Sequence, residues 1–188
     1  WKALLALGVS LSLQIGVNYA NDYSDGIKGS DDDRVGPLRL VGSGLVPASQ
    51  VKIAAFGVLG HGALLGLGLV VTSSWWLLLI GAAALFAAWG YTGGSNPYGY
   101  RALGEVSVFL FFGLVAVLGT TFVQLGTVNL PAVAGSIGIG ALACVILVAN
   151  NLRDRAKDEL VDKLTLAVVL GDKKSRLLFA GLNLLAIL

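Results

Sequence analysis

Six long apolar runs alternate with polar stretches along the chain of 188 residues. They cover about 1–20, 51–72, 75–91, 103–125, 129–149 and 175–188. A helix needs about 20 residues to cross the hydrocarbon core of a bilayer. Four runs reach that length, 75–91 is short but within range, and the sequence stops inside the last run. The pattern therefore predicts an all-α integral membrane protein.

The composition favours membrane helices over a soluble core. Charged residues make up 13% of the chain, whereas about 25% is normal for a soluble domain. The 26 glycines suit helices that pack closely in a membrane. Because Cys144 is the only cysteine, the chain forms no internal disulfide and no cysteine metal site, and we interpret Cys144 as a small core residue.

The polar connections are of two kinds, and this predicts the orientation. Residues 21–50, 92–102 and 150–174 are long and charged, whereas 72–74 and 126–129 are short turns. If every run crosses the membrane, the three charged connections share one side. In or beside them lie 12 of the 13 Lys and Arg residues. The positive-inside rule makes that side cytoplasmic, and we expect a multi-pass protein of the cell membrane with no nucleic-acid partner.

Two acidic motifs begin where apolar runs end. The first consists of Asn18, Asn21, Asp22 and Asp25, and the second of Asn150, Asp154 and Asp158. Their spacings place each set on one face of a helix. Stacked carboxylates repel one another unless a cation lies between them, and Mg²⁺ accepts carboxylate and amide oxygens. We therefore predict a Mg²⁺ ion that holds a phosphorylated substrate at these acids.

Basic residues lie close to both motifs. Lys28, Arg34 and Arg39 follow the first motif, and Lys163 follows the second. Such side chains recognise phosphate by charge and geometry, but the positive-inside rule explains them equally well. The run Asp31–Asp33 supplies either further metal ligands or, as we prefer, a solvated acidic turn.

The connection 91–105 is rich in large side chains. Tyr91, Tyr98, Tyr100, Arg101 and Glu105 are set among glycines and a proline. Ring faces line flat substrates and attract cations, so this loop is a candidate site for an aromatic substrate or a cationic intermediate. The alternative is that the tyrosines anchor the chain at the membrane interface.

Two further features favour structural roles. His61, the only histidine, falls near mid-membrane, and we favour a neutral ring bonded to a neighbouring helix over a functional group. The apolar run 164–170 is too short to span, and we expect a helix or lid over the cytoplasmic face.

Together these features suit a diphosphate attached to a lipid. Mg²⁺ neutralises a diphosphate and makes it a better leaving group. Loss of diphosphate from an allylic chain leaves a carbocation, which a dry pocket lined with tyrosine can stabilise. We expect the hydrocarbon tail to lie between helices.

The segments Asn18-x-x-Asn21-Asp22-x-x-Asp25 and Asp154-x-x-x-Asp158 look like the two aspartate-rich motifs of the UbiA superfamily of intramembrane prenyltransferases. Five segments resemble the branch that acts on 1,4-dihydroxy-2-naphthoate: 21–31, 34–39, 91–94, 97–105 and 150–168. The resemblance implies a UbiA-type transmembrane bundle of nine helices around a central cavity. The chain would be an interior piece of a longer protein and hold about six of them.

The resemblance also implies an activity and a set of site residues. The reaction would be Mg²⁺-dependent transfer of a polyprenyl group from polyprenyl diphosphate to 1,4-dihydroxy-2-naphthoate, with release of diphosphate and CO₂, giving demethylmenaquinol. By position, the Mg²⁺ and diphosphate ligands would be Asp22, Asp25, Asp154 and Asp158, helped by Asn18, Asn21 and Asn150. Phosphate contacts would come from Lys28, Arg34, Arg153 and Lys163, and ring or allylic contacts from Tyr91, Tyr100, Arg101 and Glu105.

Two positions depart from the pattern of the superfamily. Gly29 stands where a third aspartate is often found, with Asp31 or Asp33 as substitutes, and Asp162 stands where we expect glycine.

Three other functions are alternatives. The first is a UbiA-type enzyme with a hydroxybenzoate, haem or chlorophyll-type acceptor, against which the loop 91–105 argues. The second is a membrane transporter, which would need charges near mid-membrane that these runs lack. The third is a CDP-alcohol phosphotransferase, whose aspartate pattern continues with Ala-Arg after Asp-Gly, whereas Asp25-Gly26 continues with Ile27-Lys28.

Overall fold

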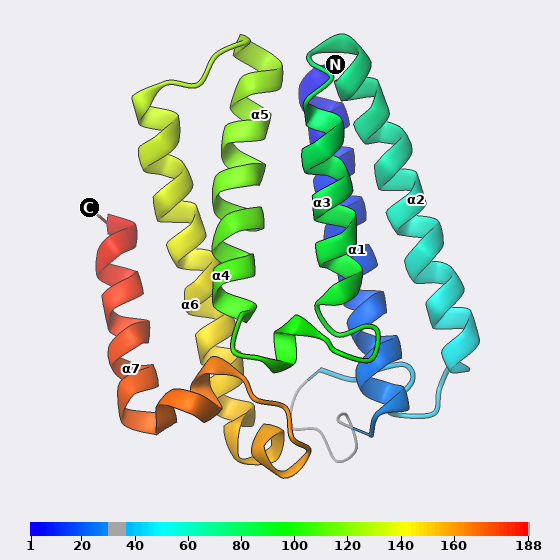
Figure 1. Cartoon of the computed structure of the whole chain (residues 1–188), viewed down its shortest axis with the longest axis vertical. Helices are drawn as coiled ribbons and strands as arrows, with labels where there is room; N and C mark the ends of the chain where they lie inside the picture. The colour runs from blue at the N-terminus through cyan, green and yellow to red at the C-terminus, as the bar shows by residue number, and fades with distance from the viewer. Residues whose placement is uncertain (30–36, 188) are drawn as a thin grey trace. The chain divides into compact units, whose positions relative to one another are not determined.

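The chain divides into two helical units, Trp1–Pro97 and Tyr98–Leu188, in a computed structural model that describes residues 1–29 and 37–187 (Figure 1). Over these described residues there is no β-strand, only an isolated bridge between Arg101 and Leu164. The predicted all-α membrane fold is confirmed. Arg34 and the acidic turn Asp31–Asp33 lie outside the described residues.

Three helices build the first unit: α1 (Lys2–Ile27), α2 (Ala48–Thr72) and α3 (Leu77–Gly90). The helices α1 and α2 pack along each other, and small residues let them approach closely. A Cβ atom on Gly16 would lie only 2.5 Å from Cδ2 of Leu59, and one on Gly62 would lie 2.9 Å from Cβ of Ser12. Gly16 and Gly62 therefore serve helix packing.

His61 joins α2 to α1. Its Nδ1 lies 3.0 Å from Oγ of Ser12, within the apolar part of both helices. This is the neighbouring-helix bond that the sequence favoured for the only histidine, and it satisfies two polar side chains inside a membrane helix pair.

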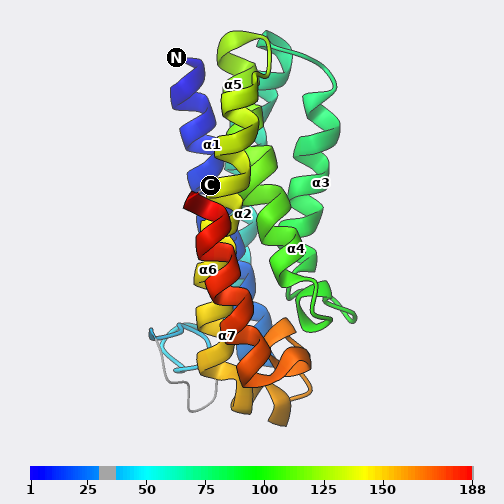
Figure 2. The ribbon, with the colours of Figure 1, turned by 90° about the vertical axis from the view of Figure 1, so that its left-hand side faces the viewer.

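The second unit begins with a 3₁₀ turn, η1 (Tyr98–Tyr100), followed by one long interrupted helix. This helix consists of α4 (Gly104–Val108), the π-helical segment η2 (Phe109–Val115) and α5 (Ala116–Leu125). Next comes α6 (Leu130–Leu160). Asn129 caps its N-terminus, since its Oδ1 accepts a hydrogen bond from the backbone nitrogen of Ala132 at 2.9 Å. Finally, α7 (Leu166–Ile187) packs along α6 (Figure 2).

The π-helical segment approaches α6 very closely. A Cβ atom on Gly113 would lie 2.6 Å from Cα of Gly140 and 2.8 Å from the carbonyl oxygen of Ser136. Only a glycine fits such a contact between two backbones. The interruption of the helix is therefore held in place by α6.

The last helix contains the predicted short segment 164–170 from Leu166 onward. Gly171 has φ 75° and ψ 173°, which is not helical, and the chain changes direction there (Figure 1). The first part of α7 thus forms a short helix of its own near the end of α6, and the second part runs back along α6. Its predicted role as a lid stays a prediction.

Within residues 1–29 and 37–187, four helices are long and apolar enough to cross a membrane: Lys2–Ile27, Ala48–Thr72, Gly104–Leu125 and Leu130–Leu160. Leu77–Gly90 is apolar but shorter. Large side chains such as Leu79 and Phe86 are 74% and 80% exposed, as expected for surfaces that face lipid. The chain is a multi-pass membrane protein. Both acidic motifs lie on helices that continue beyond their apolar runs, since α1 extends to Ile27 and α6 to Leu160.

We expect Gly113→Ala to lower the thermal stability of the protein. The added methyl group would overlap the backbone of α6, and overpacking of this kind costs about 1–3 kcal/mol. Gly119→Ala is the matched control, because nothing lies within 4 Å of a Cβ there and alanine is the better helix former. Melting both variants in one detergent by circular dichroism tests this, and equal melting temperatures would contradict the close contact.

Candidate functional site

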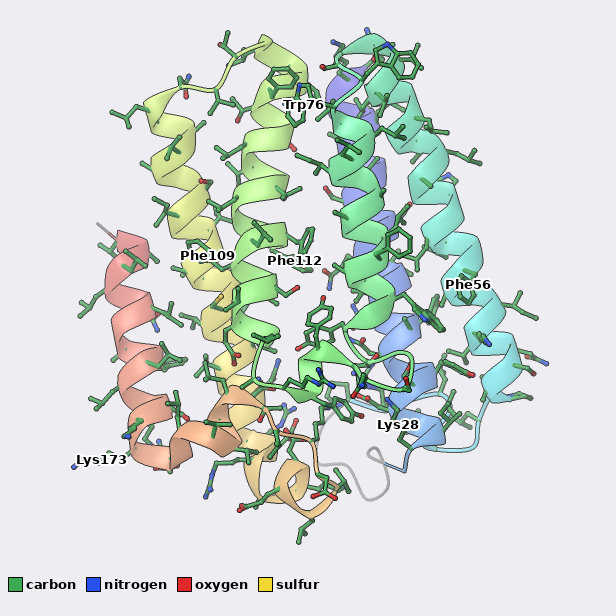
Figure 3. The ribbon with its side chains drawn as sticks, in the orientation of Figure 1. Lys28, Phe56, Trp76, Phe109, Phe112 and Lys173 are labelled. Carbon is green, nitrogen blue, oxygen red and sulfur yellow. The ribbon has the colours of Figure 1, made fainter. Side chains whose placement is uncertain are left out.

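The site residues predicted from sequence fall into two groups, one in each unit. Asn18, Asn21, Asp22, Asp25, Lys28 and Tyr91 belong to the first unit. Tyr100, Arg101, Glu105, Asn150, Arg153, Asp154, Asp158 and Lys163 belong to the second. In each unit the polar side chains gather at the end where the helices leave their apolar runs (Figure 3).

Asp22 anchors the loop that leads to α2. It is 5% exposed, its Oδ2 accepts a hydrogen bond from the backbone nitrogen of Leu40 at 2.9 Å, and its Oδ1 accepts one from Val41 at 3.0 Å. A Cβ atom on Gly26 would lie only 2.5 Å from Cγ1 of Val41, so the loop packs directly against α1. A carboxylate has about four lone-pair sites, and two of them stay open to another partner.

Asp25 lies three residues further along the same face of α1 and is 3% exposed. Two carboxylates are therefore buried side by side at the end of a membrane helix. Burial of this kind is costly unless the charges are paired or bind a metal. Ser24, between them, has a buried hydroxyl with no hydrogen-bond partner among the described residues.

Asn21 and Lys28 both hold Thr92, a residue that the sequence analysis missed. The Thr92 hydroxyl donates to Oδ1 of Asn21 at 2.8 Å, and Nζ of Lys28 donates to the Thr92 carbonyl oxygen at 2.7 Å. These bonds fasten the segment after α3 to the end of α1. The next residue must be glycine, because a Cβ on Gly93 would lie 2.6 Å from the carbonyl oxygen of Trp89.

Aromatic rings from three helices meet near this polar end. The rings of Tyr23 and Trp89 stack with centroids 6.1 Å apart, and those of Phe56 and Trp89 are 4.6 Å apart. Nζ of Lys52 lies 5.4 Å from the ring of Tyr23. Tyr91 is the half-buried residue that ends α3. Asn18 is exposed and donates to the carbonyl oxygen of Gln14 at 2.8 Å on its own helix.

In the second unit, Glu105 is a buried carboxyl group with one oxygen occupied. Its Oε1 accepts a hydrogen bond from Nδ2 of Asn151 at 3.0 Å, and its backbone oxygen accepts one from Sγ of Cys144 at 3.2 Å. Its Oε2 is buried and has no partner among the described residues. An unpaired buried acceptor costs about 1–3 kcal/mol, and a ligand that donates a hydrogen bond would recover that cost.

Asn151, rather than Asn150, is the amide that faces this carboxyl group. The motif spacing pointed to Asn150, which is exposed and accepts a hydrogen bond from Nη1 of Arg153 at 3.3 Å. The adjacent asparagine could have been noticed in the pair Asn150-Asn151, but its partner lies 46 residues away in sequence. Cys144 is 2% exposed, as expected for a core residue.

Asp154 and Arg153 pair with each other. Nε of Arg153 lies 2.7 Å from Oδ1 of Asp154 and Nη2 lies 2.6 Å from Oδ2. The side chains are 37% and 24% exposed, so the pair contributes little to stability and can exchange for a ligand. Arg153, predicted to contact phosphate, and Asp154, predicted to bind the metal, thus already form an ion pair.

Asp158, Lys163 and Tyr100 form the other part of this group. Nζ of Lys163 lies 3.9 Å from Oδ1 of Asp158 and 5.3 Å from the centroid of the Tyr100 ring. The backbone nitrogen of Lys163 also donates to the carbonyl oxygen of Asp158 at 2.8 Å. The second motif and the tyrosine loop therefore meet, as the sequence analysis required for a shared site.

The backbone joins the same two segments. The nitrogen of Ala102 donates to the carbonyl oxygen of Leu164 at 2.7 Å, beside exposed Arg101. Asp162 has φ 54°, a left-handed conformation that glycine adopts without strain, which explains why glycine was expected there. Tyr98 lies 2.9 Å from Oγ of Ser107, and burial raises the pKa of its phenol, so it stays neutral at pH 7.

The paired carboxylates fit Mg²⁺. This ion commonly takes one or two protein carboxylates and completes its shell with phosphate and water oxygens. Over residues 1–29 and 37–187, no three His, Cys, Asp or Glu side chains form a cluster that would cage a metal. The buried pair Asp22 and Asp25 nevertheless supplies the hard oxygen donors that a metal site shared with a phosphorylated ligand requires.

Comparison with known proteins gives matches over the whole chain. The UbiA prenyltransferase family matches residues 1–188. A *Mycobacterium tuberculosis* protein named 1,4-dihydroxy-2-naphthoate octaprenyltransferase is 57% identical over 97% of this chain. The *Escherichia coli* protein of that name is 40% identical over 93%, and the *Gallus gallus* UbiA prenyltransferase domain-containing protein 1 is 30% identical over 88%.

The chain spans 62%, 59% and 50% of the length of these three curated relatives, in that order. No solved structure matches it. Because the family match extends from the first residue to the last, the chain belongs to the UbiA prenyltransferase family.

Proposed function

We propose that the protein transfers a polyprenyl group from an allylic diphosphate to 1,4-dihydroxy-2-naphthoate, with release of diphosphate and CO₂ and formation of demethylmenaquinol. The observation that carries the proposal is 57% identity, over 97% of the chain, to a relative named for this acceptor. The relatives from *E. coli* and *Bacillus subtilis* carry the same name at 40% and 34% identity.

The two acidic motifs bind the diphosphate in this proposal. Asp22, Asp25, Asp154 and Asp158 would hold Mg²⁺ and, through it, the diphosphate. Bound Mg²⁺ would neutralise the diphosphate and make it a better leaving group. The buried position of Asp22 and Asp25 supports this role, because it lets their charges act at low dielectric.

Basic and amide groups complete the diphosphate site. Lys28, Arg34, Arg153 and Lys163 would contact phosphate oxygens, and Asn18, Asn21 and Asn150 would assist. The exposed pair of Arg153 and Asp154 supports an exchange on binding, in which Arg153 turns to phosphate and Asp154 to the metal.

The acceptor would lie against the tyrosine loop. Tyr91, Tyr100 and Arg101 would contact the ring or the allylic carbon. Glu105 would accept a hydrogen bond from a ring hydroxyl through its unpaired Oε2, while Asn151 holds Oε1. A dihydroxy aromatic acid supplies the donor that this oxygen lacks. The site would open to the cytoplasmic side of the cell membrane, in keeping with the distribution of basic residues.

An acceptor panel tests the proposal directly. Membranes that contain the complete protein are supplied with labelled polyprenyl diphosphate and either 1,4-dihydroxy-2-naphthoate or 4-hydroxybenzoate. We expect label in a lipid-soluble product with the naphthoate alone. Transfer to hydroxybenzoate at an equal or higher rate would assign the protein to another acceptor.

We expect Asp154→Asn to lower prenyl transfer by about a hundredfold or more, since it removes a charge that metal-bound diphosphate needs. Glu159→Gln, an exposed acid on the same helix, is the matched control and should leave the rate within about twofold of wild type. Chelation with EDTA should abolish transfer, and added Mg²⁺ should restore it. Full activity in EDTA, or in Asp154→Asn, would refute a metal-bound diphosphate at this motif.

Asn151→Ala removes the hydrogen bond that holds the Glu105 carboxylate, the proposed acceptor for the naphthoate hydroxyl. We expect it to raise the KM for the naphthoate about tenfold, because a hydrogen bond to a charged group is worth about 1.5–3 kcal/mol. The KM for prenyl diphosphate should stay within about twofold. Asn183→Ala removes an amide that bonds only its own helix, and it serves as the control. An equal rise of both KM values would show a general structural role for Asn151 instead.

A further inference from the structure

A recess lies between α6 and α7 and shares one residue, Arg153, with the groups described above. It has a volume of about 430 Å³ and is lined by Ala149, Leu152, Arg153, Arg176 and Phe179. Three of these side chains are apolar, and the other two are guanidinium groups from different helices. Nothing in the proposed reaction uses Arg176 or Phe179.

The recess lies at the boundary between membrane and water. Ala149 is the last residue of the apolar run of α6, and Arg153 follows one turn later. On α7, Arg176 ends the charged segment 172–176, and the apolar part that contains Phe179 begins at Leu177. Both helices thus change from apolar to basic at the same recess. A ligand that fits must have an apolar portion and an anionic group next to it.

The arginines keep capacity for such an anion. Arg176 bonds Asp172 through Nε at 2.8 Å and Nη2 at 3.1 Å, which keeps the pKa of the Asp172 carboxyl below its ordinary value. The two side chains are 68% and 52% exposed, and ion pairs of that exposure contribute little. Among the described residues Nη1 of Arg176 has no partner. The segment 172–176 carries three basic residues and one acidic residue, so it attracts anions.

We infer that this recess binds an anionic phospholipid, with the headgroup phosphate between Arg153 and Arg176 and the start of an acyl chain against Leu152 and Phe179. Basic pockets between membrane helices bind anionic lipid headgroups by charge, and arginine binds phosphate oxygens through paired donors. The inference concerns a lipid that is not consumed. Arg153 is shared with the proposed diphosphate contacts, whereas Arg176 is not, so Arg176 is the residue that tests the inference.

Native mass spectrometry of the complete protein in detergent tests the inference. The protein is titrated with phosphatidylglycerol or with phosphatidylcholine of the same acyl chains. We expect one phosphatidylglycerol to bind about tenfold more tightly than phosphatidylcholine, and Arg176→Gln to remove most of that preference. Lys174→Gln, which removes the same charge two residues away and outside the recess, should keep the preference within about twofold.

Further measurements separate the outcomes. Arg176→Lys should recover part of the preference, which shows that a loss in Arg176→Gln comes from charge and not from misfolding. Equal binding of the two lipids by wild type, or an equal loss in Lys174→Gln, would overturn a specific site. In a last measurement, geranyl diphosphate is added to the protein with bound phosphatidylglycerol. If it displaces the lipid from wild type but not from Arg176→Gln, the recess belongs to the substrate diphosphate. That result would also overturn the inference.

Discussion

Polar side chains at the ends of the membrane helices hold the loops that follow. The Asp22 carboxylate accepts hydrogen bonds from the backbone nitrogens of Leu40 and Val41. Asn21 and Lys28 form hydrogen bonds with Thr92. In the second unit, Asp158 and Lys163 do the same for the turn after α6. A loop leaving a bilayer has few apolar contacts available, so hydrogen bonds from the helix ends must fix its path. These bonds fix the loop before α2, the segment at Thr92 and the turn after α6.

In the proposed function, this use of the acids would favour ligand binding. Carboxylates that already accept hydrogen bonds keep one orientation before a ligand arrives, so less side-chain entropy is lost on binding. Arg153 and Asp154 are different, because they neutralise each other at an exposed position. The UbiA prenyltransferase family therefore appears here with one acidic motif fixed by the fold and another held in an exchangeable ion pair.

Much of the fold could be predicted because hydrophobic length and period are local properties of the sequence. The apolar runs predicted the helices, and their polar ends marked the acidic motifs. What could not be predicted depends on partners far along the chain: Thr92 lies 71 residues from Asn21, and Asn151 lies 46 residues from Glu105. Motif spacing selected Asn150 because it shares a helical face with Asp154 and Asp158. Only a tertiary contact shows that Asn151 is the residue that meets Glu105. The extension of α1 and α6 past their apolar runs could be predicted only from the helical spacing of the acidic motifs, because the apolar pattern ends earlier.

The π-helical segment Phe109–Val115 sets the rotation of Glu105 about its helix axis. An α-helix advances about 40° past a full turn every four residues, so positions 105, 109 and 113 would drift around an ordinary helix. The wider turns of η2 offset this drift, and Glu105, Phe109 and Gly113 all contact α6. Loss of a single residue from this segment would restore an ordinary helix and turn the Glu105 carboxyl by about 100° away from Asn151, while Gly113 kept its place against Gly140. The π-helical segment that interrupts the helix thus orients the Glu105 carboxyl group toward Asn151.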